Sequence, residues 1–182
     1  MRKILTLTAS LVLFTALVAN SSAGATTSKA AYEFHVGSPT TAAMADNGDV
    51  VLMSGLGSMD ASAKTASGGG TFTHMSGSTV LASGTWTATR LLSFQFYGCG
   101  HLGAIVLPPN FCGGRASLDI QLAGHSAGRP DVTITAAGLL QIECLIGDPP
   151  PSNEEGVRLN VQDVINFNKT VPESGTTLFL AQ

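Results

Sequence analysis

The sequence predicts an all-β protein. Apolar and polar residues alternate with a period of two through most of the chain, which places successive side chains on opposite faces of a strand. Turn residues recur at intervals of roughly eight to twelve positions. No apolar pattern at helical spacing extends beyond a single turn, expected at most over Val161–Asn168. We therefore expect about nine strands in a single antiparallel β-barrel, favoured by the local hairpins, with a two-sheet β-sandwich as the alternative.

The strands predicted in the first half of the chain are bounded by turn residues. Asp46–Asp49 (DNGD) is a tight-turn sequence, Gly68–Gly70 opens the third strand, and Ser76–Ser78 precedes the longest strand region, Thr79–Tyr97. The residues expected to share a face within these four strands are Tyr32, Phe34 and Val36; Val50, Leu52, Ser54 and Leu56; Phe72 and His74; and the even-numbered residues from Val80 to Phe96.

The strands predicted in the second half are shorter. Asp148–Pro151 is a stiff extended segment, which we interpret as a loop within one domain because only about 30 residues follow it, too few for a second core. The residues expected to share a face in each strand are Leu118, Ile120 and Leu122; Val132, Ile134 and Ala136; Leu140, Ile142, Cys144 and Ile146; Val157, Leu159 and Val161; and Leu178 and Leu180.

The first 25 residues have the pattern of a cleavable signal peptide. Arg2 and Lys3 precede an apolar run over Ile4–Val18, and Ala23–Ala25 supplies the small residues that signal peptidase requires. A membrane anchor is the alternative, but the run is shorter than the roughly 20 residues of a spanning helix. We therefore predict a signal peptide over residues 1–25 and one all-β domain over residues 26–182, secreted or periplasmic and with no membrane attachment after cleavage.

The charge of the chain excludes some partners. The net charge is −3, and it becomes −5 when the two basic residues of the signal peptide are removed. The basic residues are scattered, so the sequence shows no footprint for nucleic acid or for an anionic membrane.

Three cysteines are present, Cys99, Cys112 and Cys144. An exported protein meets an oxidising compartment, so we expect one disulfide bond. Cys99–Cys112 is the favoured pair because it closes a short loop that contains Pro108 and Pro109, and Cys99–Cys144 is the alternative. The remaining thiol is expected to be a small buried side chain rather than a nucleophile.

The candidate ligand-binding residues are His74, Trp86, Arg90 and Phe94. In the predicted strand Thr79–Tyr97 the even-numbered residues form the apolar face, and Arg90 is its polar exception. A charge on such a face needs a partner or a wet cavity. His74 lies on the preceding strand, so His74, Trp86 and Arg90 are expected to line one pocket. The alternative is structural: an ion pair for Arg90, which a one-residue slip would turn outward, and a hydrogen-bonded core role for His74.

No catalytic or metal motif is apparent. The four histidines lie on separate segments without metal-ligand spacing, and Asp46–Asp49 lacks the later glutamate of a calcium loop. The sequence contains no G-x-S-x-G, no C-x-x-C and no phosphate-binding loop. We expect no cofactor, no metal and no catalytic residue that the sequence alone identifies.

Two stretches, GGGTFTHMSGSTVLASGTWTATRLLSFQFYGCG and ECLIGDPPPSNEEGVRLNVQDVINFNK, resemble a group of uncharacterised secreted bacterial proteins. This resemblance implies no activity and no site residues. Gly84-Thr85-Trp86 looks like the G-x-W of lipocalin and avidin-type barrels, and the hairpin pattern is similar to allene oxide cyclase-like barrels. In lipocalins the tryptophan lies near the start of the barrel and an arginine from a distant strand covers it, whereas Arg90 is on the same strand as Trp86. The likeness implies a barrel that holds a ligand.

The function expected from the sequence is that of a secreted, non-enzymatic module that binds a small apolar or amphipathic molecule. One alternative is a barrel enzyme of the isomerase or cyclase type that uses His74 as acid or base, which requires a polar partner for His74. The other is an extracellular or envelope protein-interaction module without a pocket. The ligand, the oligomeric state and any catalysis are not specified by the sequence.

Overall fold

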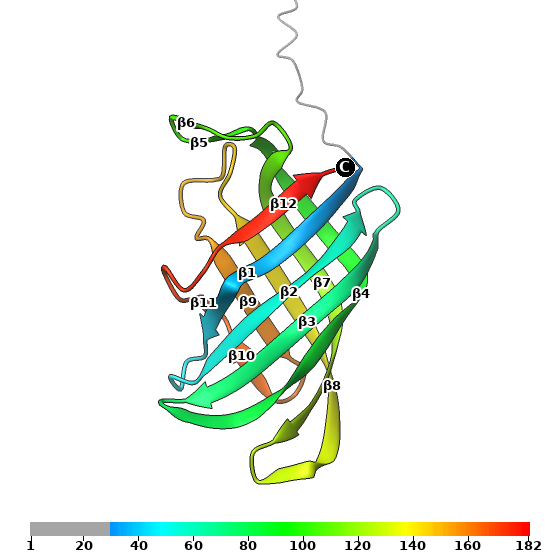
Figure 1. The fold of residues 1–182 in the computed structure, drawn as a ribbon, viewed down its shortest axis with the longest axis vertical. Coiled ribbons are helices and arrows are strands. Elements are labelled where there is room, and N and C mark those ends of the chain that lie inside the picture. Colours follow the sequence, from blue (N-terminus) through cyan, green and yellow to red (C-terminus); the bar gives the residue numbers. More distant parts are fainter. Residues whose placement is uncertain (1–29) are drawn as a thin grey trace, which may run out of the picture.

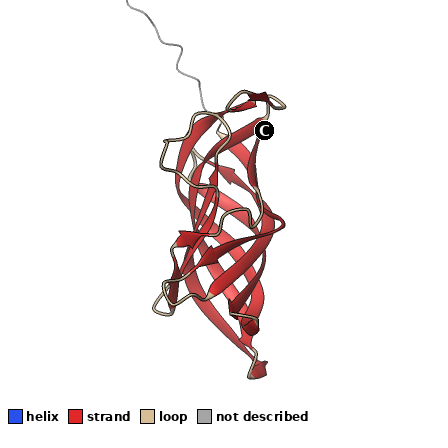
Figure 2. Cartoon of the chain, turned by 90° about the vertical axis from the view of Figure 1, so that its left-hand side faces the viewer, coloured by secondary structure: helices blue, strands red, loops and turns tan. Residues whose placement is uncertain are grey.

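The hairpins of this protein form where tight turns join segments in which apolar and polar residues alternate. The computed structural model describes residues 30–182, so the predicted signal peptide lies outside the described residues. Figure 2 shows that strands supply all the regular structure of this part. The strands are β1 (Ala31–Met44), β2 (Val50–Asp60), β3 (Thr65–Ser76), β4 (Thr79–Cys99), β5 (His101–Leu102), β6 (Ile105–Val106), β7 (Phe111–Ser126), β8 (Arg129–Cys144), β9 (Gly156–Val161), β10 (Ile165–Phe167), β11 (Lys169–Thr170) and β12 (Thr177–Ala181).

One large antiparallel sheet contains all of these strands except β5 and β6, which pair with each other. The order is β10-β9-β8-β7-β12-β1-β2-β3-β4, and β4 also pairs with β7 along most of its length. The opposite edge of β7 is shared: Phe111 and Cys112 pair with β12, and the residues from Gly114 onward pair with β8. The sheet therefore curls round on itself, with β1 and β12 in front of β7 and β8 in Figure 1. The predicted all-β class is confirmed, and the curled sheet is compatible with both of the architectures considered.

The interior is built from the inward faces of the curled sheet. Tyr32, Phe34 and Val36 are buried, as their alternation predicts. Phe34 stacks on Trp86 with ring centroids 6.4 Å apart. The glycines of β2 make room for these rings, because a Cβ on Gly57 would lie 2.4 Å from Cζ of Phe34. Large side chains that are also fully buried are Met53, Leu91, Leu118, Leu140, Ile142, Leu159, Phe167 and Phe179.

Two irregularities in β4 correct the predicted orientation of Arg90. The register of β4 against β7 shifts between Ala88 and Arg90 and again between Leu91 and Ser93. An extra residue in one strand exchanges its inner and outer faces beyond that point. Ala88 and Leu91 are consequently buried, whereas Arg90 points outward. The prediction that the even-numbered face stays inward through Arg90 is wrong.

Alternation alone does not say which face of a strand is buried, and the structure shows it for β2 and β12. The residues of β2 that include Leu52 and Leu56 share the outer face, and Leu56 is 64% exposed. In β12 the buried face carries Phe179, and Leu178 and Leu180 share the opposite face. One other predicted detail is wrong. The segment after Val161 forms a turn and then strand β10 rather than a helical turn.

The disulfide bond is Cys99–Cys112, which confirms the favoured pairing. It joins the end of β4 to the start of β7 and closes the segment that contains the β5–β6 hairpin. Cys144 is the free cysteine of the described residues and is buried, and this burial raises the pKa of its thiol to about 12. A thiol in this state is a packed side chain rather than a nucleophile.

Candidate functional site

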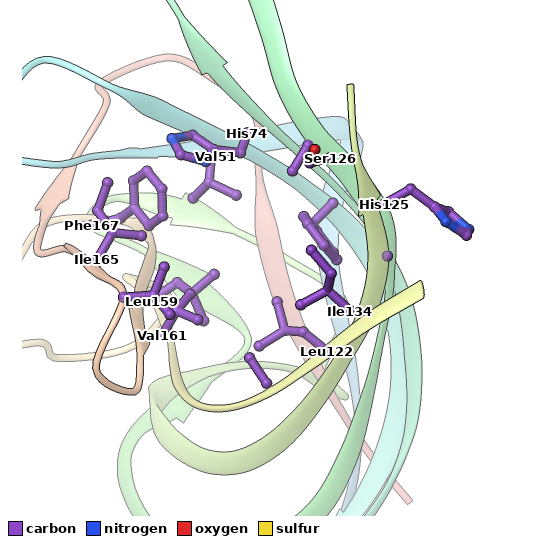
Figure 3. A pocket seen from close by; sticks show the side chains of 15 residues that line it. Val51, His74, Leu122, His125, Ser126, Ile134, Leu159, Val161, Ile165 and Phe167 are labelled. Atoms are coloured by element: carbon purple, nitrogen blue, oxygen red, sulfur yellow. The ribbon is translucent and has the colours of Figure 1, made fainter. Parts of the chain in front are cut away.

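A cavity of about 190 Å³ lies between the strands at the end of the sheet opposite the β5–β6 hairpin. Strands β2, β3, β4, β7, β8, β9 and β10 contribute to it, so segments far apart in the sequence meet there (Figure 3). Its walls are almost entirely apolar. They are formed by Val51, Phe72, His74, Ala82, Leu122, Gly124, His125, Ser126, Ile134, Ala136, Leu159, Val161, Val164, Ile165 and Phe167.

The cavity has a buried floor and an open mouth. Leu122, Leu159 and Phe167 are buried, whereas Ile134 is 54% and Val164 is 71% exposed. The mouth lies where the β8–β9 pairing ends, because the ladder covers only Gly138–Glu143 and is followed by one hydrogen bond from the N–H of Gln162 to the carbonyl oxygen of Ala137. A small molecule therefore has a path from solvent to the apolar floor.

His74 and Asp49 form a polar pair at the cavity. Nε2 of His74 lies 3.0 Å from Oδ2 of Asp49, and both side chains are largely shielded from solvent. The uninterrupted β2–β3 register brings them together, because Val51 pairs with His74 and Asp49 therefore faces the end of β3. The hairpin turn is fixed by Asp60, whose side chain accepts hydrogen bonds from the backbone N–H groups of Ser62 and Ala63.

The environment of Asp49 keeps its carboxyl group ionised. Hydrogen bonds from Ser76 and His74 lower the pKa of Asp49 below its usual range, against a smaller effect of burial. The backbone N–H of Asp49 donates to Oδ1 of Asn47, which holds the turn. The rings of Phe167 and His74 meet in a T-shaped contact, with centroids 5.1 Å apart and planes at 84°. The imidazole is therefore held on one side by a carboxylate and on another by an aromatic ring.

Of the four predicted ligand-binding residues, His74 is the one that lines the cavity. Trp86 is buried in the core, where its Nε1–H donates a 3.0 Å hydrogen bond to the carbonyl oxygen of Ser54. In the β3–β4 ladder Trp86 pairs with Gly70 and His74 with Ala82, four residues away along each strand. At about 3.3 Å per residue this separation is roughly 13 Å.

Phe94 and Arg90 lie elsewhere. Phe94 packs on Phe179, with ring centroids 5.1 Å apart. Arg90 forms an exposed ion pair with Asp119, with Nη2 and Oδ2 2.6 Å apart. The expectation that His74, Trp86 and Arg90 line one pocket is wrong, because Trp86 lies too far along its strand and the register shifts in β4 turn Arg90 outward.

Sequence reasoning missed two residues of this site. Asp49 belongs to the DNGD turn and Phe167 to the segment Val161–Asn168, and neither local pattern predicts a contact with His74. A turn at Asp60 is the sequence signal that identifies Asp49, since this turn sets the β2–β3 register and thereby the neighbour of His74. Figure 3 also shows that His125 points away from the cavity although its backbone belongs to the wall.

A second polar cluster surrounds Glu143, whose side chain is fully buried. Arg115 donates two hydrogen bonds to its carboxylate, Arg158 donates one, and the hydroxyl of Tyr97 donates another. Burial and the nearby carboxylate raise the pKa of Tyr97 to about 12. Asn153 donates to the Tyr97 hydroxyl oxygen, so the cluster ties the loop before β9 to the sheet. Its groups satisfy one another, which is the arrangement of a structural ion pair.

The described residues contain no group of three or more His, Cys, Asp or Glu side chains suited to a metal ion. In the same residues no helix has the length and apolar character needed to cross a membrane. The comparisons with known proteins found no matching family model, no similar curated protein and no solved structure with a significantly similar fold. The resemblances suggested by the sequence thus remain predictions.

Proposed function

We propose that this domain is a secreted or periplasmic binding module that holds one small apolar or amphipathic molecule in the cavity between β2, β3, β4, β7, β8, β9 and β10. The observation that supports the proposal is an apolar cavity of about 190 Å³ with an open mouth. A cavity of about 150 Å³ with apolar walls is large enough to hold benzene. The disulfide bond Cys99–Cys112 fits an oxidising compartment outside the cytoplasm.

The size of the cavity limits the ligand. Sites for drug-sized molecules enclose roughly 300–1,000 Å³. The present cavity is smaller, so it suits a single ring or a short branched chain rather than a fatty acid or a sterol. The partly exposed Ile134 and Val164 would be covered by such a ligand only at its outer end.

The test is binding of toluene, followed by the ¹³C-methyl NMR signals of Leu122, Leu159 and Ile134. We expect these signals to shift on addition of toluene. Ala136→Leu places three more heavy atoms in the cavity and should abolish the shifts, whereas Ala137→Leu on the adjacent exposed position should preserve them. The proposal fails if toluene leaves the wild-type methyl signals unchanged, or if it binds the Ala136→Leu variant equally well.

A proton-transfer enzyme of the isomerase type is the second candidate, and the His74–Asp49 pair is the observation that favours it. An imidazole oriented by a carboxylate is a common general base. Cyclohexanone is a probe of suitable size with exchangeable C–H groups beside its carbonyl group. The wild-type protein should accelerate exchange of these protons for deuterium in D₂O, and His74→Phe should not. An exchange rate equal to that in buffer, with cyclohexanone bound, removes this candidate.

A further inference from the structure

The protonation of His74 determines what kind of polar group the cavity can recognise. An ionised carboxylate only accepts hydrogen bonds, so the 3.0 Å contact with Asp49 requires the proton of His74 to be on Nε2. In the neutral imidazole the other nitrogen, Nδ1, is then an acceptor. Within residues 30–182 no group donates a hydrogen bond to Nδ1. Nδ1 of His74, a residue of the cavity wall, is therefore an acceptor without a donor among these residues.

The polar groups of the cavity lie together. His74 and Ser126 are close to the same edge in Figure 3, and Leu122, Leu159 and Val161 form the opposite walls. A ligand that satisfies both parts has one polar group at the edge and an apolar body on the floor. A purely apolar molecule would fill the floor and leave Nδ1 without a partner.

The charge beside His74 restricts the polar group further. The carboxylate of Asp49 lies next to the imidazole and repels an anionic ligand. The apolar walls disfavour any ligand that keeps a full charge, because transfer of an ion out of water costs several kcal/mol without a partner. An uncharged hydrogen-bond donor is neither repelled by the carboxylate of Asp49 nor subject to the free-energy cost of transferring an ion from water.

We infer that the ligand of this cavity is an uncharged molecule of about one ring, such as a phenol or a cyclic alcohol, whose hydroxyl group donates a hydrogen bond to Nδ1 of His74. This inference rests on the proposed binding function and adds the chemical class of the ligand. His74 is thus a specificity-determining residue, and Asp49 is a positioning residue that fixes which nitrogen of His74 carries the proton.

The test compares four probes at neutral pH: phenol, anisole, toluene and benzoate. One net hydrogen bond corresponds to about fivefold in affinity. The wild-type protein should bind phenol about fivefold more tightly than anisole or toluene, and benzoate least tightly. His74→Phe should retain toluene binding and lose the preference for phenol. His35→Phe is the matched control, because the half-exposed side chain of His35 on β1 is not part of the cavity wall, and it should keep the preference.

The outcomes separate the inference from the proposed function. Absence of toluene binding contradicts the binding function itself. Toluene binding without a preference for phenol, a preference that persists in His74→Phe, or tighter binding of benzoate overturns the inference and leaves the binding function standing.

A measurement without substitution covers the case in which His74→Phe does not fold. In protein with ¹⁵N-labelled histidine, the Nδ1 signal of His74 should have the shift of an unprotonated nitrogen. It should move toward the hydrogen-bonded position with phenol and not with toluene. A proton on Nδ1 in the free protein overturns the inference.

Discussion

Arg115 and Glu143 form a two-pronged ion pair across the β7–β8 ladder, with Nε and Nη2 of the arginine each 3.0 Å from a carboxylate oxygen. Glu143 is fully buried, whereas the Arg115 side chain is 32% exposed. Arg158 and Tyr97 donate the remaining hydrogen bonds to the same carboxylate. The pair lies on the outer side of the sheet and is covered by the loop that contains Asn153. It joins the loop, β7, β8 and β9 at one point.

Removal of Arg115 should destabilise the protein strongly. Arg115→Met keeps the apolar stem and deletes two of the hydrogen bonds to a buried carboxylate, so we expect a loss of about 3 kcal/mol in the free energy of unfolding. Arg90→Met is the matched control because Arg90 makes the same type of contact with Asp119 on the surface. It should cost less than about 1 kcal/mol. Urea denaturation measures both values, and equal losses would contradict the structural role assigned to Glu143.

The glycines of β2 are predicted to be required for packing of the aromatic core. A Cβ at position 57 would lie 2.4 Å from Cζ of Phe34 and within 2.1 Å of the carbonyl oxygen of Ser67. Gly57→Ala should therefore cost about 1–3 kcal/mol through overpacking. Gly128→Ala is the control, because no atom lies within 4 Å of its added Cβ. Thermal unfolding should separate the two variants, and equal midpoints would show that Phe34 moves aside without cost.

The disulfide bond should stabilise the domain by lowering the conformational entropy of the unfolded chain. Cys99 and Cys112 are 13 residues apart, and closure of a loop of this length is worth about 3 kcal/mol. The double variant Cys99→Ala, Cys112→Ala should lose about that amount in guanidinium denaturation. Dithiothreitol should destabilise the wild type to the same level and leave the double variant unchanged. An effect of the reductant on the double variant would indicate another target.

The local pattern predicted the fold class because side chains alternate wherever the strands are regular. Phe34 and Trp86 lie in regular segments and are buried as their periods require. Arg90 follows an irregularity in β4, and neither Thr89 nor Leu92 marks that irregularity in the sequence. An extra residue in a strand exchanges its inner and outer faces, and the alternating pattern does not report it. The predicted inner face of β4 is therefore wrong from Arg90 until the second shift restores it at Phe94.

The polar sites were less predictable because they depend on contacts between distant segments. Glu143 lies between Ile142 and Cys144, which share a face in the alternating pattern, so the pattern alone places Glu143 on the opposite face. It is buried because the loop carrying Asn153 returns over that face, which no local pattern reports. The contact of Asp49 with His74 needed only the register of one hairpin and was therefore within reach of sequence reasoning. The cavity depends on the relative positions of seven strands, which local sequence patterns do not predict.

Glu155 is predicted to destabilise the folded state at neutral pH. Burial raises its pKa above the usual value of 4.5, against opposing hydrogen bonds from the backbone at Thr177 and Leu145. Between the unfolded and folded pKa values the native state binds more protons, so the free energy of unfolding falls as pH rises through that window. The favourable contribution of Glu155 is fully present below pH 4.5 and is lost above its folded pKa.

Glu155→Gln keeps an acceptor for the N–H of Thr177 and removes the charge, so the variant should be more stable than wild type at pH 7 and equal to it near pH 4. Glu173→Gln, at an exposed position, reports the general effect of one fewer negative charge. Urea denaturation across this pH range measures the difference, and a Glu155→Gln variant that is less stable at pH 7 would show that the charge itself has a favourable partner.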